Sequence, residues 1–122
     1  MEALVRVMSR AVVGVSPRTG AHEAEEVALA SGVDHLLVFD WEHLVGVASL
    51  SALQHADRAA TVSDCMVEPV TTISASASVE QAADLMRSSD VTCLPVVAGG
   101  LILGVVTRDQ LGASTSSAST LR

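Results

Sequence analysis

Aromatic side chains are nearly absent from this chain of 122 residues. Phe39 and Trp41 are the only two, and there is no tyrosine. Single-stranded nucleic acids are commonly held by aromatic side chains that stack on the bases, so the composition argues against this mode of binding. Since 49% of the residues are hydrophobic, the chain can still form a core, and that core must be aliphatic.

Lysine is absent, and the balance of charge is acidic. The seven basic residues are all arginine and stand against fourteen acids, which gives a net charge of −7. A surface of this charge repels the phosphate backbone of nucleic acids and an anionic membrane. We therefore expect neither partner, whereas a local arginine could still bind the isolated phosphate of a small nucleotide.

Long hydrophobic runs are also missing. No run approaches the roughly 20 residues that span a bilayer, and Met1–Leu4 lacks the basic and hydrophobic regions of a signal peptide. The two cysteines, Cys65 and Cys93, form neither a CxxC pair nor a disulfide framework. The sequence thus predicts a cytoplasmic protein with both thiols reduced.

The chain contains an internal repeat. A shift of 58 residues lays residues 8–53 over residues 66–111 without a gap, and the apolar positions match throughout. Matching positions include Met8 and Met66, Val38 and Val96, and Gly46 and Gly104. We interpret the pattern as a tandem duplication, with a first copy at 1–57, a linker at 58–65, a second copy at 66–111 and a disordered tail at 112–122.

Each copy predicts the order strand, helix, strand, strand, helix. The strands are expected at Val12–Ser16, Leu36–Phe39, Leu44–Ala48, Val70–Ser74, Leu94–Val97 and Leu101–Val106. Gly99-Gly100 suits a tight hairpin turn between the last two. The fold class is therefore α/β, with two β-α-β-β-α repeats. A unit of about 50 residues has too little core to stand alone, so we expect the copies to pack sheet to sheet about a pseudo-two-fold axis.

The helices carry recognisable start and stop signals. Ser78 and Gln81 form a capping box before an apolar stripe in the second copy, and Gly32 offers a stop after the first copy's helix. Short helices are expected from Leu50 to about Ala56 and from Arg108 onward. The second copy's helix has more apolar residues than one sheet is expected to cover, namely Val79, Ala82, Ala83, Leu85 and Met86. This excess predicts a homodimer.

The ordered series of motifs resembles the cystathionine-β-synthase-type (CBS) domain pair, or Bateman module, over roughly residues 4–111. The segments that carry the resemblance are Val62–Met66, Val70–Ile73, Val79–Met86, Leu94–Val97 and Leu103–Leu111. The first copy is more diverged, with Ser49 where the second has Thr107. The resemblance implies a regulatory module, commonly dimeric, that binds an adenosine-containing ligand in the cleft between its copies.

The resemblance also implies which residues bind. The Thr motif of one copy is expected to face the first two strands of the other, so one cleft would hold Val12, Val13, Gly14, Val33, His35, Leu36, Thr107, Arg108, Asp109 and Gln110. The opposite, weaker cleft would hold Ser49, Ala52, Val70, Thr71 and Cys93. Because the weaker cleft has no basic group, it should bind phosphate poorly, and we expect one ligand per chain.

Each polar group of the stronger cleft has an expected role. Thr107 can donate to a phosphate or ribose oxygen, and Arg108 can reach the phosphate. A phosphate near His35 would favour the charged form of the ring, and so binding at lower pH. An alternative stays open, because Thr107 and Gln110 also form a capping box and the hydroxyl could serve only as a cap.

The chain departs from the family's motif at the position expected to bind the ribose of the ligand. The family's motif has an acid three residues after the Thr or Ser, and this chain has Gln110 and Ala52 at the two positions. Asp109 could substitute only if the helix started at a shifted position. The identity of the ligand, with AMP, ADP, ATP or S-adenosylmethionine as candidates, therefore stays open.

Other clusters give weaker hypotheses. His22 and Glu26 have the i, i+4 spacing of a metal pair but no third ligand nearby, so a solvated helix face is the preferred interpretation. No cysteine has an activating histidine in a local signature, and no Walker loop or dinucleotide fingerprint occurs. The sequence predicts no enzyme, no catalytic residue, no metal site and no cofactor.

Three functions remain. The preferred one is a regulatory module that senses an adenosine-containing ligand and acts on a protein that the sequence does not identify. The second is a structural interaction module with a decayed pocket. The third is a thiol or metal sensor that uses Cys93 and His35.

Overall fold

The computed structural model describes residues 2–112 and divides into two compact units. Unit 1 is formed by Met1–Ala11 together with Thr71–Arg122, and unit 2 by Val12–Val70. Residue 112, placed in the tail by the sequence, is helical, and the rest of the predicted tail lies outside the described residues. Within 2–112, no helix is long and apolar enough to cross a membrane.

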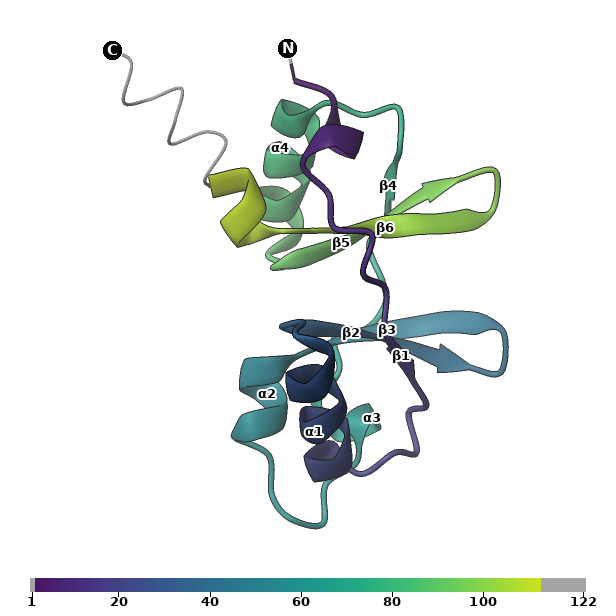
Figure 1. The fold of residues 1–122 in the computed structure, drawn as a ribbon, viewed down its shortest axis with the longest axis vertical. Helices are drawn as coiled ribbons and strands as arrows, with labels where there is room; N and C mark the ends of the chain where they lie inside the picture. The colour runs from purple at the N-terminus through teal and green to yellow at the C-terminus, as the bar shows by residue number, and fades with distance from the viewer. Residues whose placement is uncertain (1, 113–122) are drawn as a thin grey trace. The chain divides into compact units, whose positions relative to one another are not determined.

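Unit 2 holds one mixed sheet with helices. In the sheet β1 lies parallel to β2, and β2 lies antiparallel to β3 (Figure 1). The elements of the unit are β1 (Gly14–Val15), α1 (Ala21–Ser31), β2 (His35–Asp40), β3 (His43–Ser49), α2 (Leu50–Gln54) and α3 (Val62–Cys65).

Unit 1 repeats this plan. Its sheet has the order β4-β5-β6 with the same parallel and antiparallel pairs. The elements are the 3-10 helix η1 (Leu4–Arg6), β4 (Ile73–Ser74), α4 (Val79–Ser89), β5 (Cys93–Ala98) and β6 (Leu101–Thr107), and residues 108–112 are helical. The predicted fold class, α/β with two β-α-β-β-α repeats, is confirmed, and the mutual packing of the copies stays a prediction.

Local signals in the sequence decide where these elements begin and end. The Ser78 side chain accepts from the Gln81 amide, and the Gln81 side chain accepts from the Ser78 amide, as the predicted capping box requires. Gly32 ends α1 with a φ of 71°. Gly99 and Gly100 take φ values of 56° and 80° in the turn between β5 and β6, which is the geometry of a two-residue hairpin loop.

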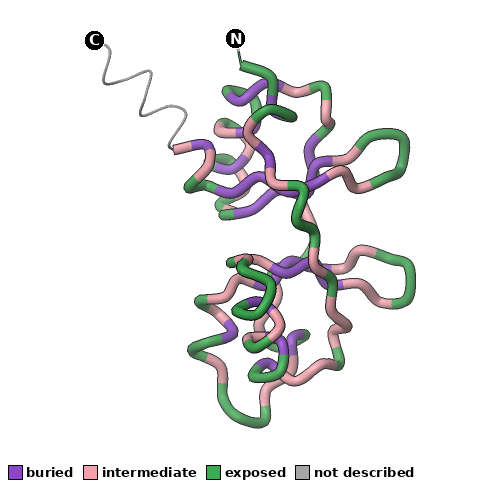
Figure 2. The backbone as a smooth tube through the Cα atoms, viewed as in Figure 1, coloured by how far each residue is buried: buried purple, intermediate pink, exposed green. Residues whose placement is uncertain are grey.

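Each unit has its own aliphatic core. In unit 2 the core includes Leu36, Val38 and Val62, and in unit 1 it includes Leu4, Leu94 and Val96. Figure 2 shows the buried residues gathered on the strands and on one side of the helices within each unit. Val47 and Val105, which a shift of 58 residues matches to each other, occupy equivalent positions in the two units and are each 8% exposed.

The α4 face that suggested a dimer is covered within unit 1. Val79, Ala82 and Met86 are at most 3% exposed, and Ala83 and Leu85 pack against the same core. The unit's own sheet and N-terminal residues take up this face. The homodimer therefore stays a prediction without the support that the sequence lent it.

Two segments ahead of the repeats complete the sheets in a way that the sequence does not predict. We call residues 2–11 the N-terminal strap and residues 60–69 the linker strap. The Ser9 amide donates to the Val105 carbonyl at 2.8 Å, and the Ser9 carbonyl accepts from the Val105 amide at 2.9 Å. Val67 and Val47 form the same pair of hydrogen bonds. The N-terminal strap thus belongs to the unit of the second copy, and the linker strap to the unit of the first.

The linker strap is an ordered element. The sequence treats residues 58–65 as a linker, whereas the structure places α3 there with Val62 fully buried. Val62 donates its amide to the Thr19 carbonyl, just as Leu4 donates to Ala77 in the other unit. The copies therefore exchange their leading segments, and the repeat boundaries at 1–57 and 66–111, which describe the duplication, differ from the compact units.

Candidate functional site

The end of β6 in unit 1 carries the predicted threonine motif. Thr107 is 8% exposed and precedes the helical residues 108–112. Its amide donates to Gln110 Oε1 at 2.8 Å, and its Oγ1 accepts from the Gln110 amide at 3.4 Å. The predicted capping box is therefore formed. Accepting this bond uses one lone pair of the hydroxyl, whose proton can still be donated to a ligand.

The residues after Thr107 are held by the start of the same helix. The Arg108 amide donates to the Thr92 carbonyl at 2.9 Å, and its exposed guanidinium donates to the Val91 carbonyl at 3.3 Å. The helix starts directly after Thr107, so the shifted start under which Asp109 could replace the acid does not occur. Asp109 is exposed, one position before the capping partner Gln110.

The sheet register adds a neighbour to Thr107. Cys93 opens β5 and lies directly opposite Thr107 on the adjacent strand, where it is 4% exposed. The sequence assigns Cys93 to the weaker cleft with Ser49, and that assignment stays a prediction; within unit 1 the register places Cys93 at the Thr107 edge of the sheet. Because it is buried, the Cys93 thiol packs as a small apolar side chain and is not an accessible redox sensor.

The corresponding edge of unit 2 joins His35 and Ser49. These two residues lie opposite each other where β2 begins and β3 ends. Ser49 Oγ accepts from the Ala52 amide at 3.1 Å and so caps α2. His35 Nδ1 lies 3.0 Å from Asp34 Oδ1, with the His35 side chain 11% exposed and the Asp34 side chain 59% exposed.

Asp34 is a member of this edge that the sequence analysis missed. Its carbonyl accepts from the Leu50 amide at 2.8 Å, the same role that Thr92 plays toward Arg108 in unit 1. Its carboxylate engages the Nδ1 atom of His35, which places a negative charge beside a residue expected to meet phosphate. The position next to His35 was the available signal.

The predicted aliphatic lining of unit 2 is partly exposed and partly core. Val12 is 37% exposed, and Val13 and Val33 are half-buried against the core of unit 2. Leu36 is fully buried within that core and offers no exposed side chain. A Cβ added at Gly14 would lie 3.0 Å from the Phe39 ring, so the ring packs on this glycine.

An open groove lies beside β3, next to part of the predicted weaker cleft. It has a volume of about 570 Å³ and is lined by Leu44, Val45, Glu68, Pro69 and Val70. Glu68 is the only charged residue in the lining, and its carboxylate disfavours a phosphate there. Of the other members of the weaker cleft, Ala52 and Thr71 are half-buried.

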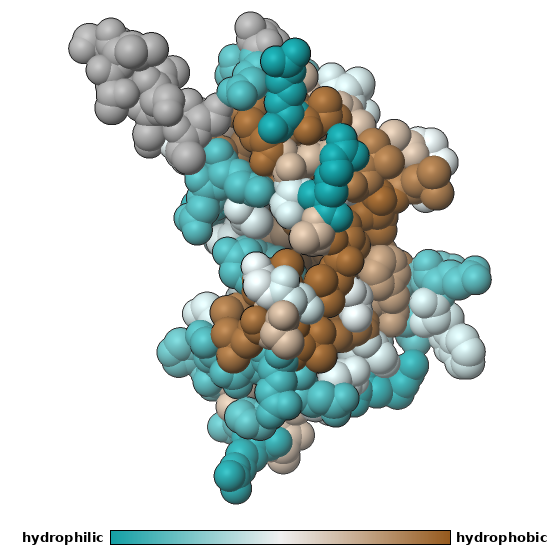
Figure 3. Space-filling view, viewed as in Figure 1, coloured by the Kyte–Doolittle hydropathy of each residue, from teal (hydrophilic) through white to brown (hydrophobic). Residues whose placement is uncertain are grey.

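Charge is distributed unevenly between the units. Unit 2 contains nine acids and two arginines, whereas unit 1 contains five of each, so unit 2 accounts for the whole net charge of −7. Figure 3 shows mostly hydrophilic side chains over the lower part of unit 2, where α1 lies. An anionic ligand is therefore electrostatically favoured at unit 1 over unit 2.

Comparison with known proteins adds the family. The CBS domain family matches residues 62–111. A solved CBS domain pair in complex with 5′-methylthioadenosine and S-adenosyl-L-methionine has a TM-score of 0.84, with 19% identity, over 97% of this chain and 98% of its own. CBSX2 in complex with AMP has a TM-score of 0.75 at 25% identity, over 98% of this chain and 99% of its own. Residues 62–111 thus form a CBS domain, and the chain as a whole has the fold of a CBS domain pair.

One curated relative of this CBS pair is an enzyme. Inosine-5′-monophosphate dehydrogenase of Thermoplasma acidophilum is 26% identical over 106 residues, which are 86% of this chain. The CBS pair spans only 22% of the length of that enzyme. The expectation that this CBS pair has no enzymatic activity stays a prediction.

The hypothesis of a thiol or metal sensor finds no support in this CBS pair. His22 pairs with Glu25 at 3.3 Å instead of Glu26. Among residues 2–112, no three His, Cys, Asp or Glu side chains group closely enough to hold a metal ion. Burial raises the pKa of the Cys65 thiol above its usual value, and the Asp64 carboxylate raises it further, so this thiol is a weak nucleophile.

Proposed function

We propose that this CBS pair is a regulatory module that binds one adenosine-containing ligand per chain. The observation that carries the proposal is its likeness, over nearly the whole of both chains, to CBSX2, which was solved with AMP. A second CBS pair of the same fold was solved with 5′-methylthioadenosine and S-adenosyl-L-methionine. Each of these ligands contains adenosine, so we propose the same ligand class here.

The end of β6 is the proposed contact for the ligand's phosphate or ribose. Thr107 retains a hydroxyl proton to donate, and Arg108 is exposed and weakly held by one carbonyl, so its guanidinium can turn toward an anion. Unit 1 also lacks the net negative charge of unit 2. These features support the assignment of the stronger site to Thr107 rather than to Ser49.

The ribose is expected to be bound less tightly than an acidic residue would allow. Gln110 stands at the position of the family's acid, and its Oε1 accepts the Thr107 amide. Its NH₂ group can donate to a ribose oxygen, but an amide offers a weaker acceptor for two ribose hydroxyls than a carboxylate. We therefore propose that the ligand binds with modest affinity. The site would select its ligand by the adenine and by the phosphate of a nucleotide or the sulfonium of S-adenosylmethionine.

A second candidate function is a structural interaction module whose pocket has decayed. Gln110 and Ala52 favour it, because neither copy retains the acid. Both hydroxyls of the motif, on Thr107 and Ser49, are also engaged as helix caps. Under this alternative no adenosine-containing compound should bind.

A thermal-shift panel of AMP, ADP, ATP, S-adenosylmethionine and NADH separates the two functions. A ligand at 100 times its Kd stabilises the fold by about 2.7 kcal/mol, which is readily measured. The ligand that binds is then titrated by calorimetry, with one site per chain expected. No stabilisation by any compound at millimolar concentration would favour the interaction module.

Four variants locate the site. Thr107→Val and Ser49→Ala each remove one helix cap and should each lose about 1 kcal/mol of stability. Of these two, only Thr107→Val should weaken ligand binding, by about tenfold, and Thr107→Ser should bind as the wild type does. His35→Ala should also weaken binding. Two equal sites per chain, or normal binding by Thr107→Val, would contradict the assignment.

A further inference from the structure

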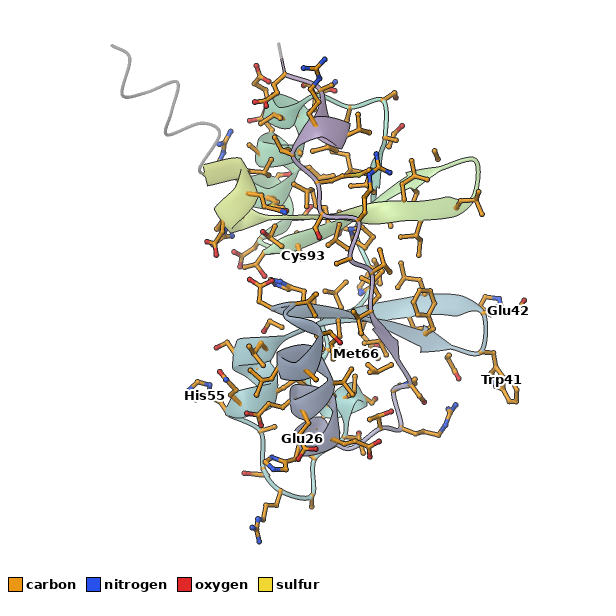
Figure 4. All side chains as sticks on the ribbon, in the orientation of Figure 1. Glu26, Trp41, Glu42, His55, Met66 and Cys93 are labelled. Carbon is orange, nitrogen blue, oxygen red and sulfur yellow. The ribbon has the colours of Figure 1, made fainter. Side chains whose placement is uncertain are left out.

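The tip of the β2–β3 hairpin carries a large side chain that the fold does not use. Trp41 is the only tryptophan of the chain, and it is 87% exposed. In Figure 4, Trp41 and its neighbour Glu42 lie at the end of the hairpin and point away from the body of unit 2. Burial in unit 2 therefore does not account for a tryptophan at this position.

The backbone at Trp41 is also unfavourable for this residue. Its φ is 59°, in the left-handed region that bulky L-residues rarely adopt. The equivalent residue of the second copy is Gly99, which takes a φ of 56° without a steric penalty. Glycine would thus serve the turn better, and Trp41 neither stabilises the turn nor fills the core. Strained, exposed residues of this kind occur at sites of function.

The surroundings of Trp41 are acidic. Asp40 precedes it and pairs with Arg18 at 3.2 Å, and Glu42 follows it. The two side chains of the Asp40–Arg18 pair are 43% and 68% exposed, so the pair is open to exchange with another cation. With nine acids and two arginines, unit 2 as a whole attracts a basic surface.

We propose that the tip formed by Asp40, Trp41 and Glu42 is a docking site for a partner protein with an apolar pocket bordered by arginine or lysine. Tryptophan, with tyrosine and arginine, is enriched among the side chains that dominate interface energies, and these side chains cluster in well-packed pockets. The two flanking acids would pair with the basic border and orient the approach. The acidic charge disfavours nucleic acids and anionic membranes as alternative partners.

The decisive variant is Trp41→Gly, because it replaces a strained residue with the one that the other copy uses. It should keep or raise the thermal stability of the chain, so a loss of binding does not report unfolding. Leu101→Ser is the matched control, since Leu101 is also an exposed apolar residue, 68% accessible, where the other hairpin turns. Glu42→Lys tests the charge at the tip.

Immobilised wild-type chain and the three variants are exposed to an extract of the source cells. Proteins retained by the wild type and by Leu101→Ser, but not by Trp41→Gly, are identified and purified. Each is then titrated with wild-type chain labelled with 5-fluorotryptophan, whose fluorine NMR spectrum reports Trp41 alone. We expect a shifted resonance on binding, a loss of about 30-fold or more in affinity for Trp41→Gly, and a smaller, salt-dependent loss for Glu42→Lys.

Four outcomes would overturn the proposal. In the first, no protein is retained by the wild type and lost from Trp41→Gly. In the second, Trp41→Gly binds every purified partner as tightly as the wild type does. In the third and fourth, the fluorine resonance shifts only when the chain self-associates, or only with phosphatidylcholine vesicles. The last two would instead assign the tip to a second copy of the chain or to a lipid surface.

Discussion

At the scale of single residues, the two copies end their long helix with different residues in the same backbone conformation. Gly32 ends α1 and Asp90 ends α4, and both take a left-handed φ, of 71° and 54°. Glycine adopts this conformation freely, whereas aspartate pays a steric penalty there. Asp90 also places a negative charge at the negative end of the helix dipole.

Asp90→Gly should therefore stabilise the chain by up to about 1 kcal/mol, and Gly32→Asp should destabilise it by a similar amount. Thermal or urea unfolding of both variants measures the difference. If Asp90→Gly lowered the stability, the greater freedom of glycine in the unfolded chain would outweigh the strain that Asp90 adds to the folded chain.

Two other equivalent residues, Gly46 and Gly104, allow the straps to approach the sheets closely. A Cβ added at Gly104 would lie 2.3 Å from the Ser9 carbonyl oxygen, which belongs to the backbone of the N-terminal strap. A Cβ added at Gly46 would lie 2.6 Å from Met66 Sδ, which belongs to a flexible side chain. The same substitution thus meets a rigid obstacle in one unit and a movable one in the other.

Gly104→Ala should accordingly destabilise the chain by about 2 to 3 kcal/mol, and Gly46→Ala by about 1 kcal/mol. Urea unfolding checks the order of the two values. Equal losses would mean that the N-terminal strap shifts as readily as the Met66 side chain.

At the scale of elements, the straps are part of the units rather than connections between them. Leu4 is fully buried in the core of unit 1, and its neighbours in the strap bond to the backbone before α4 and to β6. The N-terminal strap is separated in sequence from the rest of its unit by the whole of unit 2. The core of unit 1 is therefore completed only when the two ends of this loop meet.

Leu4→Ala should cost about 2 to 5 kcal/mol, the range for a large side chain removed from a core. Val5→Ala is the control, because Val5 is 37% exposed and its loss should stay within about 0.5 kcal/mol. Circular dichroism during urea unfolding reports both. A small effect of Leu4→Ala would show that the strap contributes little to unit 1.

At the scale of the whole molecule, the net negative charge is confined to unit 2. Glu26 is exposed on α1, near Glu23 and Glu25, while unit 1 has no net charge. Repulsion among exposed acids is screened by salt over about 10 Å at 0.1 M ionic strength. Salt should therefore act mainly on unit 2.

Glu26→Arg should raise the stability by about 0.5 kcal/mol at low salt, and the gain should fall toward zero at high salt. Glu80→Gln is the contrasting variant, because Glu80 lies in the first turn of α4, where an acid is favourable, and its removal should lower the stability slightly. Melting curves at two salt concentrations test both signs. A gain from Glu26→Arg that is independent of salt would contradict an electrostatic origin.

Much of this fold could be predicted from the sequence because its signals are local. The Ser78–Gln81 and Thr107–Gln110 capping boxes and the glycine turn at residues 99–100 each depend on residues within three positions of one another. The straps and α3 could not be predicted, because the pairing of Ser9 with Val105 joins residues far apart in the chain. Asp34 was missed for a different reason: it adjoins His35 in the sequence, but an aspartate next to a histidine matches no binding motif.

The sequence by itself determined the duplication, the order of elements in each copy and the aliphatic character of the core. The period of 58 residues and the spacing of apolar side chains dictate these features wherever the copies lie. Only the tertiary structure decided that each copy completes its sheet with the segment ahead of the other copy, and that Cys93 stands beside Thr107. These are matters of register and close approach, which depend on backbone hydrogen bonds between distant strands, and such bonds leave no periodic trace in the side chains.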